Sequence, residues 1–193
     1  MVSKPSLRET ILSCERCPEL VATRTNIVVG EAAKYTKILL LGETPGKNED
    51  ASGIPFVGRS GMELRPRLTR AGIHIKKNAG IINVLKCYTP TGRTPLSEEL
   101  ANCKEYTVKQ IEYLKPKCII ALGRYAHAFV RGIPAYKVKV LENAGRVVYY
   151  QNIPAVLTYH PSFLVRMKEK EIFEAFEQHL ETARAIGLGP RKE

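Results

Sequence analysis

Short, uninterrupted runs of apolar residues recur along the chain, and each ends in a turn. They occupy residues 38–41, 80–85, 118–123 and 153–158. Runs of this length without alternation are typical of strands buried on both faces of a parallel sheet. Between them, apolar residues recur at helical spacing, as in residues 62–71, 100–114 and 166–186. Strands separated by helices predict an α/β fold of three layers, αβα, around a central, mostly parallel four-stranded sheet.

Other segments depart from this alternation. Residues 5–24 predict a short helix that is broken at residues 14–18 and then resumes. Residues 137–151 alternate apolar and polar positions around a central glycine, which predicts a β-hairpin. Ser60 is expected to cap the helix after it, and Pro66 should give that helix a kink or a late start. The length favours one domain over residues 1–193.

The charge balance narrows the class of partner. The chain has 30 Lys plus Arg against 19 Asp plus Glu, a net charge of +11. Such an excess favours polyanions, with nucleic acid as the natural candidate, although a solvated basic surface without a partner gives the same composition. No apolar run approaches the length of a membrane span, and the N-terminus lacks the apolar core of a signal peptide. We therefore expect no membrane association and an intracellular, cytoplasmic protein.

Polar side chains stand where three of the predicted strands end. Glu43 and His160 come after the first and last strands, and Asn83 lies within the second. Because ligands bind at the carboxyl edge of open α/β sheets, these residues are expected to converge with Phe56 from the adjoining glycine-rich loop. Simple binding does not require an acid, an amide and an imidazole at three strand ends, so the combination favours an enzyme.

Four of the five cysteines suggest a metal centre. In a reducing compartment, thiols are more often ligands, catalytic groups or core residues than disulfides. Cys14 and Cys17 form a CxxC, and Cys87 and Cys103 lie in or beside a later loop. Four thiolates suit zinc or an iron–sulfur cluster, and the spacing does not choose between them. The alternative is an incidental CxxC with two core cysteines; Cys118, inside an Ile-rich run, is expected in the core.

Several motifs in collinear order resemble those of the iron–sulfur, or family 4, uracil-DNA glycosylases. They are CxxC, GExPG with an acidic pair after it, GxPFVGRSG, NVxKC, a further cysteine, KPKxIxxLG and YHPS, and they span residues 13–166. The resemblance implies a uracil-DNA glycosylase-like fold and a monofunctional base-excision-repair hydrolase that leaves an abasic site in uracil-containing DNA. It also implies a 4Fe–4S cluster held by Cys14, Cys17, Cys87 and Cys103, in a subregion formed by the CxxC and residues around 87–103.

The same resemblance assigns roles to the strand-end residues. Phe56 would stack on the flipped base, and the amide of Asn83 would pair with uracil N3–H and O4. His160 would donate a hydrogen bond to uracil O2 as the bond breaks, while Glu43 would orient or deprotonate the attacking water. The expected contacts to DNA phosphates are Ser162 beside the substrate and, around it, Arg59, Ser60, Lys86, Arg93 and Arg166.

The sequence departs from the family pattern at a few positions. Thr44 stands where the family carries Ala or Gly and is expected to line the substrate site, and residues 88–90 read Tyr-Thr-Pro in place of Arg-Pro-Pro. His74 does not lie in the basic insertion of relatives that crosslink to uracil DNA, so we do not expect that activity. Two alternatives stay open: a glycosylase with altered base preference, such as one for deaminated purines, and a non-catalytic, metal-bearing module that binds damaged DNA. We expect a monomer, and the sequence identifies no replication-clamp partner.

Overall fold

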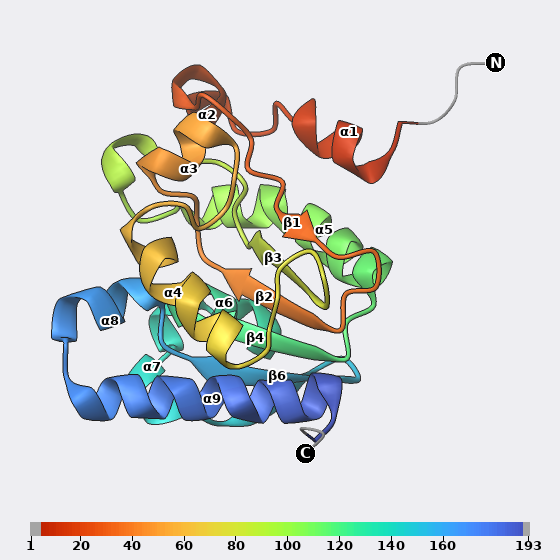
Figure 1. Ribbon diagram of the computed structural model, residues 1–193. Coiled ribbons are helices and arrows are strands. Elements are labelled where there is room, and N and C mark those ends of the chain that lie inside the picture. The colour runs from red at the N-terminus through yellow and green to blue at the C-terminus, as the bar shows by residue number, and fades with distance from the viewer. Residues whose placement is uncertain (1–4, 191–193) are drawn as a thin grey trace.

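The four apolar runs form the centre of a twisted sheet in the computed structural model of the protein, which describes residues 5–190 (Figure 1). The strand order is β1-β3-β2-β4-β6-β5, and the four central strands run parallel. Their bounds are β1 (Glu31–Ala32), β2 (Ile38–Gly42), β3 (Ala79–Asn83), β4 (Cys118–Leu122), β5 (Val147–Tyr150) and β6 (Ile153–Thr158). Every residue of β2, β3 and β4 is buried, which explains why these strands are apolar without alternation.

The sheet has six strands, so the expectation of four was too low. The two additional strands, β1 and β5, pair antiparallel at opposite edges. β1 spans only two residues, and β5 alternates between exposed and half-buried positions. β1 is therefore too short to give a sequence pattern, and β5 lies in the segment that was predicted as a separate hairpin.

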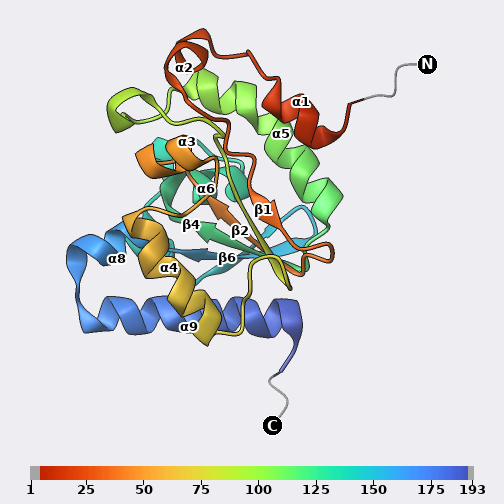
Figure 2. The same ribbon diagram turned by 45° about the horizontal axis from the view of Figure 1, so that its top comes forward.

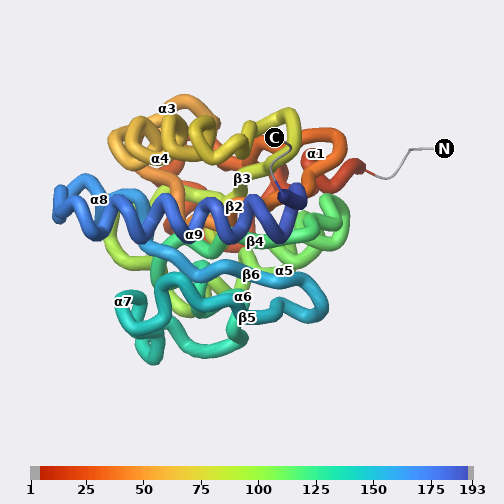
Figure 3. The backbone as a smooth tube through the Cα atoms, turned by 60° about the horizontal axis from the view of Figure 1, so that its bottom comes forward, coloured from red at the N-terminus to blue at the C-terminus, as the bar shows by residue number. Residues whose placement is uncertain are grey.

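Helices cover both faces of the sheet, which confirms the three-layer architecture (Figures 2 and 3). α4, α8 and α9 pack on one face, and α5 and α6 on the other. The bounds are α1 (Leu7–Leu12), α2 (Pro18–Thr23), α3 (Lys47–Ser52), α4 (Arg59–Arg70), α5 (Ser97–Leu114), α6 (Gly123–Arg131), α7 (Val140–Asn143), α8 (Pro161–Met167) and α9 (Lys170–Leu188), with 3₁₀ turns η1 (Pro90–Gly92) and η2 (Ala135–Lys137).

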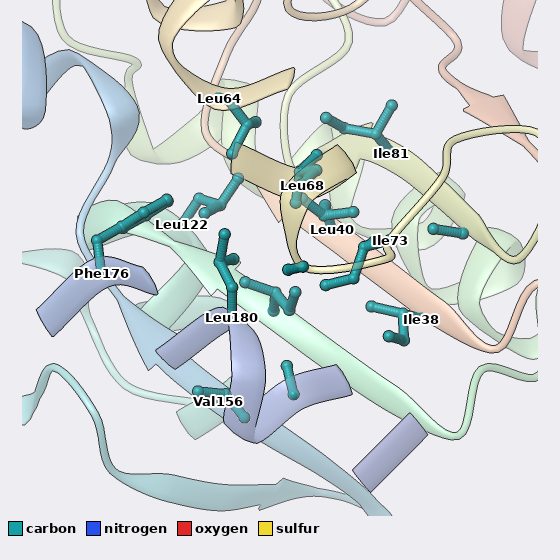
Figure 4. Packing of buried hydrophobic residues seen from close by; sticks show 14 of the residues in the cluster. Ile38, Leu40, Leu64, Leu68, Ile73, Ile81, Leu122, Val156, Phe176 and Leu180 are labelled. Atoms are coloured by element: carbon teal, nitrogen blue, oxygen red, sulfur yellow. The ribbon is translucent and has the colours of Figure 1, made fainter. Parts of the chain in front are cut away.

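The two main cores take alternate residues of each central strand. In β2, Leu40 faces the α4 and α9 side, whereas Leu39 faces the α5 and α6 side. Figure 4 shows Leu68 of α4 and Leu180 of α9 packed about Leu40 on the first side. Burying each such side chain contributes roughly 1.5–3 kcal/mol to folding.

A third, smaller core attaches the N-terminal helices to the sheet. Ile11 of α1 and Leu20 of α2 pack with Leu85, just beyond β3, and with Tyr106 of α5. The expected break between α1 and α2 is present and contains the CxxC. Among the described helices, none is long and apolar enough to cross a bilayer.

The predicted hairpin over residues 137–151 was only partly right. Its second arm is present as β5, but its first arm leads from η2 into the single helical turn α7, and the hairpin joins β5 to β6. Its turn consists of Gln151, at φ +52°, and Asn152. The valine alternation before Gly145 reflects Val138 reaching the core and Val140 packing partly against it, without strand pairing.

Helix boundaries also differ from expectation. α4 begins at Arg59 with Gly58 as its N-cap, so Ser60 is not the cap, and the helix continues through Pro66 without a late start. The long C-terminal helix is interrupted at Lys168, which adopts φ +55° and ends α8 before α9 begins. The acidic connector after the first turn contains the short helix α3.

Candidate functional site

The carboxyl ends of the parallel strands meet beside a cavity of about 400 Å³. Gly42 at the end of β2 pairs with Asn83 at the end of β3, which places the loops beyond the two strands side by side. The cavity is lined by Thr44, Pro45, Gly46, Lys47, Asn48, Glu49, Phe56, Gly58, Arg59, Ser60, Asn83, Tyr88, Thr89, Gly92 and His160. The predicted site residues Thr44, Phe56 and Asn83 are therefore brought together, along with His160.

Phe56 is held in an unusual backbone conformation by two charged side chains. It is 5% exposed and has φ +54°, a region that non-glycine residues seldom adopt. The Glu49 carboxylate accepts hydrogen bonds from Val57 N at 2.8 Å, Gly58 N at 2.7 Å and Gly46 N at 3.0 Å. From the other side, Arg65 Nε donates to Phe56 O at 2.9 Å. The acidic pair at residues 49–50 was visible in the sequence as part of a motif, but no sequence pattern predicted this function.

Asn83 presents a buried oxygen that is available for a ligand. The residue is 2% exposed, and its Oδ1 has no hydrogen-bond partner within the described part of the chain. A Cβ atom added to Gly42 would lie 2.3 Å from Asn83 Oδ1 and 2.7 Å from Phe56 Cζ. Only glycine therefore fits between the amide and the aromatic ring.

His160 carries a defined tautomer. Its Nδ1 accepts the backbone N–H of Ser162 at 3.2 Å and lies 2.8 Å from Ser162 Oγ, so this nitrogen bears the lone pair and Nε2 carries the proton. Burial lowers the pKa of His160 to about 4, and the charge of Arg166 adds to this effect. The ring, 6.0 Å from that of Phe56, is a neutral N–H donor at the cavity wall near pH 7.

Glu43 lies beside His160 without lining the cavity. Its Oε1 accepts the Tyr125 N–H at 3.0 Å, at the start of α6. Burial raises the pKa of the Glu43 carboxyl, while the N–H groups of Tyr125 and Arg124 oppose that shift. A Cβ atom on Gly123 would lie 2.6 Å from Glu43 Oε1 and 2.8 Å from His160 Cβ. The glycine at the exit of β4 therefore lets the acid and the imidazole approach each other.

The predicted phosphate contacts fall into two groups. Arg59 and Ser60 line the cavity, and exposed Arg166 donates to Ser162 Oγ at 3.3 Å. Arg93, by contrast, is held by Glu99 at 2.6 Å and by Glu19. Lys47 is a further cation that lines the cavity, and no motif in the sequence singled it out.

The prediction that Lys86 contacts DNA phosphates was wrong. Only 1% of this residue is exposed, and its Nζ donates to Asn83 O and to Thr107 Oγ1. Burial lowers the pKa of Lys86 to about 8. An ammonium group enclosed in this way cannot reach a phosphate outside the protein.

The four predicted ligand cysteines line one hollow between the α1–α2 connection, the β3 exit and α5. Arg24 Nη1 donates to Cys87 Sγ at 3.4 Å, and Asn102 Nδ2 donates to Cys17 Sγ at 3.6 Å. Burial raises the pKa of the Cys87 thiol to about 11. Within residues 5–190, no three His, Cys, Asp or Glu side chains form a group able to hold a single metal ion. Cys118 is buried in β4, as expected.

Comparison with known proteins gives consistent matches over most of the chain. Residues 29–184 match the family model of the Uracil DNA glycosylase superfamily. The chain is 38% identical to the Type-4 uracil-DNA glycosylase of Thermotoga maritima over 179 residues, 92% of this chain and 91% of that protein. It is 33% identical to the Type-4 uracil-DNA glycosylase of Archaeoglobus fulgidus over 181 residues, 91% of this chain and 90% of that protein. The corresponding protein of Pyrobaculum aerophilum is 36% identical over 165 residues, 83% of each chain.

Proposed function

Because the chain belongs to the uracil-DNA glycosylase superfamily, we propose that it hydrolyses the N-glycosidic bond of uracil in DNA and leaves an abasic site in an uncut strand. The observation that carries this proposal is the single cavity into which Phe56, Asn83 and a neutral His160 all face. To reach such a cavity, the base must leave the helical stack. A planar pocket wall, an amide and an N–H donor are the groups needed to receive it.

Base recognition is assigned to Phe56 and Asn83. The aromatic ring offers a stacking surface, which any base can use and which therefore does not discriminate. Asn83 Oδ1 lacks a donor within the described residues, and uracil N3–H supplies one, while Asn83 Nδ2 donates to O4. Cytosine presents an acceptor at N3 and a donor at C4, so it would leave the buried amide mismatched.

Bond cleavage is assigned to His160 and Glu43. As the bond breaks, negative charge develops on the departing base, and the Nε2–H of neutral His160 donates to uracil O2. Ser162, contacted in turn by Arg166, fixes the tautomer that makes this donation possible. Glu43 orients the attacking water and offsets positive charge on the sugar, next to His160 at the cavity edge.

DNA binding is assigned to exposed cations around the cavity. Arg59, Lys47 and Arg166 are exposed there, on a chain of net charge +11. They would contact phosphates flanking the flipped nucleotide together with the hydroxyls of Ser60 and Ser162.

The cysteine hollow fits the iron–sulfur cluster that the resemblance implies. Cys14, Cys17, Cys87 and Cys103 would hold a 4Fe–4S cluster through their four thiolates. All four thiols line this one hollow, a donor set that suits a cluster, and the resemblance favours the cluster over a single zinc ion. When bound, the cluster supplies a structural link between the α1–α2 connection, the β3 exit and α5.

The test is release of uracil from a labelled oligonucleotide that carries one uracil, with alkali added afterwards to cut the abasic site. Wild type should excise uracil, and Glu43→Ala should slow excision on the order of 100-fold or more, within the range for loss of a general base. A protein that binds the oligonucleotide but releases no base would instead favour the binding-module alternative.

Thr44 and Tyr88 give one specific reason to include other substrates. Both line the cavity and both depart from the family pattern, so they are the positions at which base preference would change. Hypoxanthine and a thymine mismatch should therefore be assayed in parallel. Release of hypoxanthine with uracil left intact would establish the altered base preference.

A further inference from the structure

Lys86 is a buried cation in the described structure without a carboxylate partner. It is 1% exposed, it lines the same hollow as Cys87 and Cys103, and no ion pair joins it to a carboxylate of the described residues. A buried charge without compensation is costly, so its partner must be supplied by the surroundings. Four thiolates around an iron–sulfur core carry net negative charge. The site formed by Cys14, Cys17, Cys87 and Cys103, here called the cysteine centre, is therefore the natural counterion of Lys86.

The same ammonium contacts the recognition side of the molecule. Lys86 Nζ donates to the backbone carbonyl of Asn83 and, at 2.9 Å, to Thr107 Oγ1 on α5. Thr107 Oγ1 donates in turn to Val84 O at 3.2 Å. One side chain thus ties the peptide that carries the Asn83 amide to the helix that carries Cys103.

The backbone between the two sites has little freedom. Val84 N donates to Gly42 O and Leu85 N to Glu43 O, each at 3.1 Å, so residues 84 and 85 extend the pairing of β3 with β2. Lys86 O accepts Val28 N at 2.8 Å, and the next residue is the ligand Cys87. Five consecutive residues therefore run from the base-reading amide to the metal centre, and the Lys86 side chain folds back over them.

We propose that Lys86 is a positioning residue that compensates the charge of the cysteine centre and uses the same ammonium group to fix Asn83 in its base-reading position. The inference rests on the proposed function and on the proposed 4Fe–4S cluster. It assigns Lys86 no contact with DNA or with the reacting atoms.

The test compares Lys86→Met with Lys104→Met in the iron-loaded, full-length protein. Methionine has nearly the length of lysine and suits a buried slot, whereas Lys104 is an exposed lysine directly after another ligand cysteine. Three quantities are measured: the rate of iron release to a chelator, the single-turnover rate of uracil excision at saturating enzyme, and the dissociation constant for uracil-containing duplex at fixed salt.

For Lys86→Met we expect iron release to be faster and uracil excision to be slower, each by about 10- to 100-fold. Changes of this size are usual when a residue that supports metal ligands is removed. The dissociation constant should stay within about twofold, because phosphate contacts dominate affinity. Lys104→Met should match wild type in all three. Equal behaviour of the two variants would overturn the proposal, as would a loss of affinity in folded Lys86→Met as large as its loss of rate, because a positioning residue leaves the phosphate contacts intact.

A second pair of variants covers the case in which Lys86→Met does not fold. Thr107→Val removes one acceptor of the ammonium, and Thr107→Ser keeps the hydroxyl. The valine variant should slow excision with unchanged affinity, and the serine variant should restore the rate; equal rates would refute the link to Asn83. If wild type excised no uracil, the proposed function would fail, but iron release from Lys86→Met and Lys104→Met would still decide whether Lys86 serves the cysteine centre.

Discussion

Glu49→Gln is the most informative single change, because it keeps the shape of a buried side chain and removes its charge. Glu49 is 8% exposed and receives three backbone N–H groups that belong to the loop around Phe56. A glutamine oxygen can still accept from Val57 and Gly58. Its NH₂ group then faces the N–H of Gly46, so two donors meet and one stays unsatisfied.

The loss of stability in Glu49→Gln can be estimated from these contacts. Two hydrogen bonds change from charged to neutral acceptors, which costs about 1 kcal/mol each, and one buried donor is left unpaired at about 1–3 kcal/mol. We expect the free energy of unfolding to fall by about 3–5 kcal/mol, or roughly 6–20 °C in Tm for a chain of this size. Excision should slow on the order of 10- to 100-fold, because Phe56 is no longer held in its strained conformation.

Urea unfolding monitored by circular dichroism measures the first effect, and the single-uracil oligonucleotide assay measures the second. Glu98→Gln is the matched control, since Glu98 is an exposed acid in the first turn of α5. If Glu49→Gln had the urea midpoint and the excision rate of Glu98→Gln, the carboxylate would not be the group that holds the Phe56 loop.

Three further predictions concern the strand-end residues. Asn83→Asp places an acceptor opposite uracil O4 and should reduce the rate of uracil excision on the order of 100-fold, a loss of about 3 kcal/mol of transition-state stabilisation. If the ratio of the excision rates for uracil and cytosine did not change, Asn83 would have no part in base recognition. The pKa of His160 is lowered to about 4 in the folded protein, so the unfolded state binds the proton first as the pH falls below about 6.5, and stability declines through that window. Between pH 7 and pH 5, the free energy of unfolding measured by urea titration should therefore fall less in His160→Gln than in wild type, by about 2 kcal/mol. Equal losses of stability in the two proteins would mean that the imidazole is not buried as a neutral group. Gly42→Ala puts a Cβ atom 2.3 Å from Asn83 Oδ1, so it should abolish excision while iron content stays that of wild type, and an active Gly42→Ala enzyme would contradict the described geometry.

The parts of the fold that sequence patterns predicted are those determined locally. An Ile- and Leu-rich run that ends in glycine is sufficient to indicate a buried parallel strand, and topology then brings the strand ends together. Glu43, Asn83 and His160 were found in this way, because the carboxyl edge of a parallel sheet gathers the residues at the end of each strand.

The errors arose where distant residues decide the outcome. Lys86 in a basic chain suggested a surface cation, but it is buried against Thr107 on α5 and beside the hollow lined by the cysteines. Val138 and Val140 alternate like a strand, yet Val138 is buried in the core and Val140 begins the helical turn α7. The N-cap at Gly58 depends on the Glu49 carboxylate, nine positions earlier, which spacing within the helix does not reveal.

The cysteine centre is assembled from two separated parts of the chain, and this has a consequence during synthesis. Arg24, just after the first thiol pair, contacts Cys87, which lies 63 positions later. At a translation rate of about 5–20 residues per second, Cys14 and Cys17 leave the ribosome roughly 4–15 s before Cys87. During this interval the nascent chain carries an incomplete binding site, and α1 and α2 lack the α5 surface on which they pack. The proposed cluster would therefore find all four of its thiols only after Cys103 of α5 has emerged, which places its binding late in biogenesis.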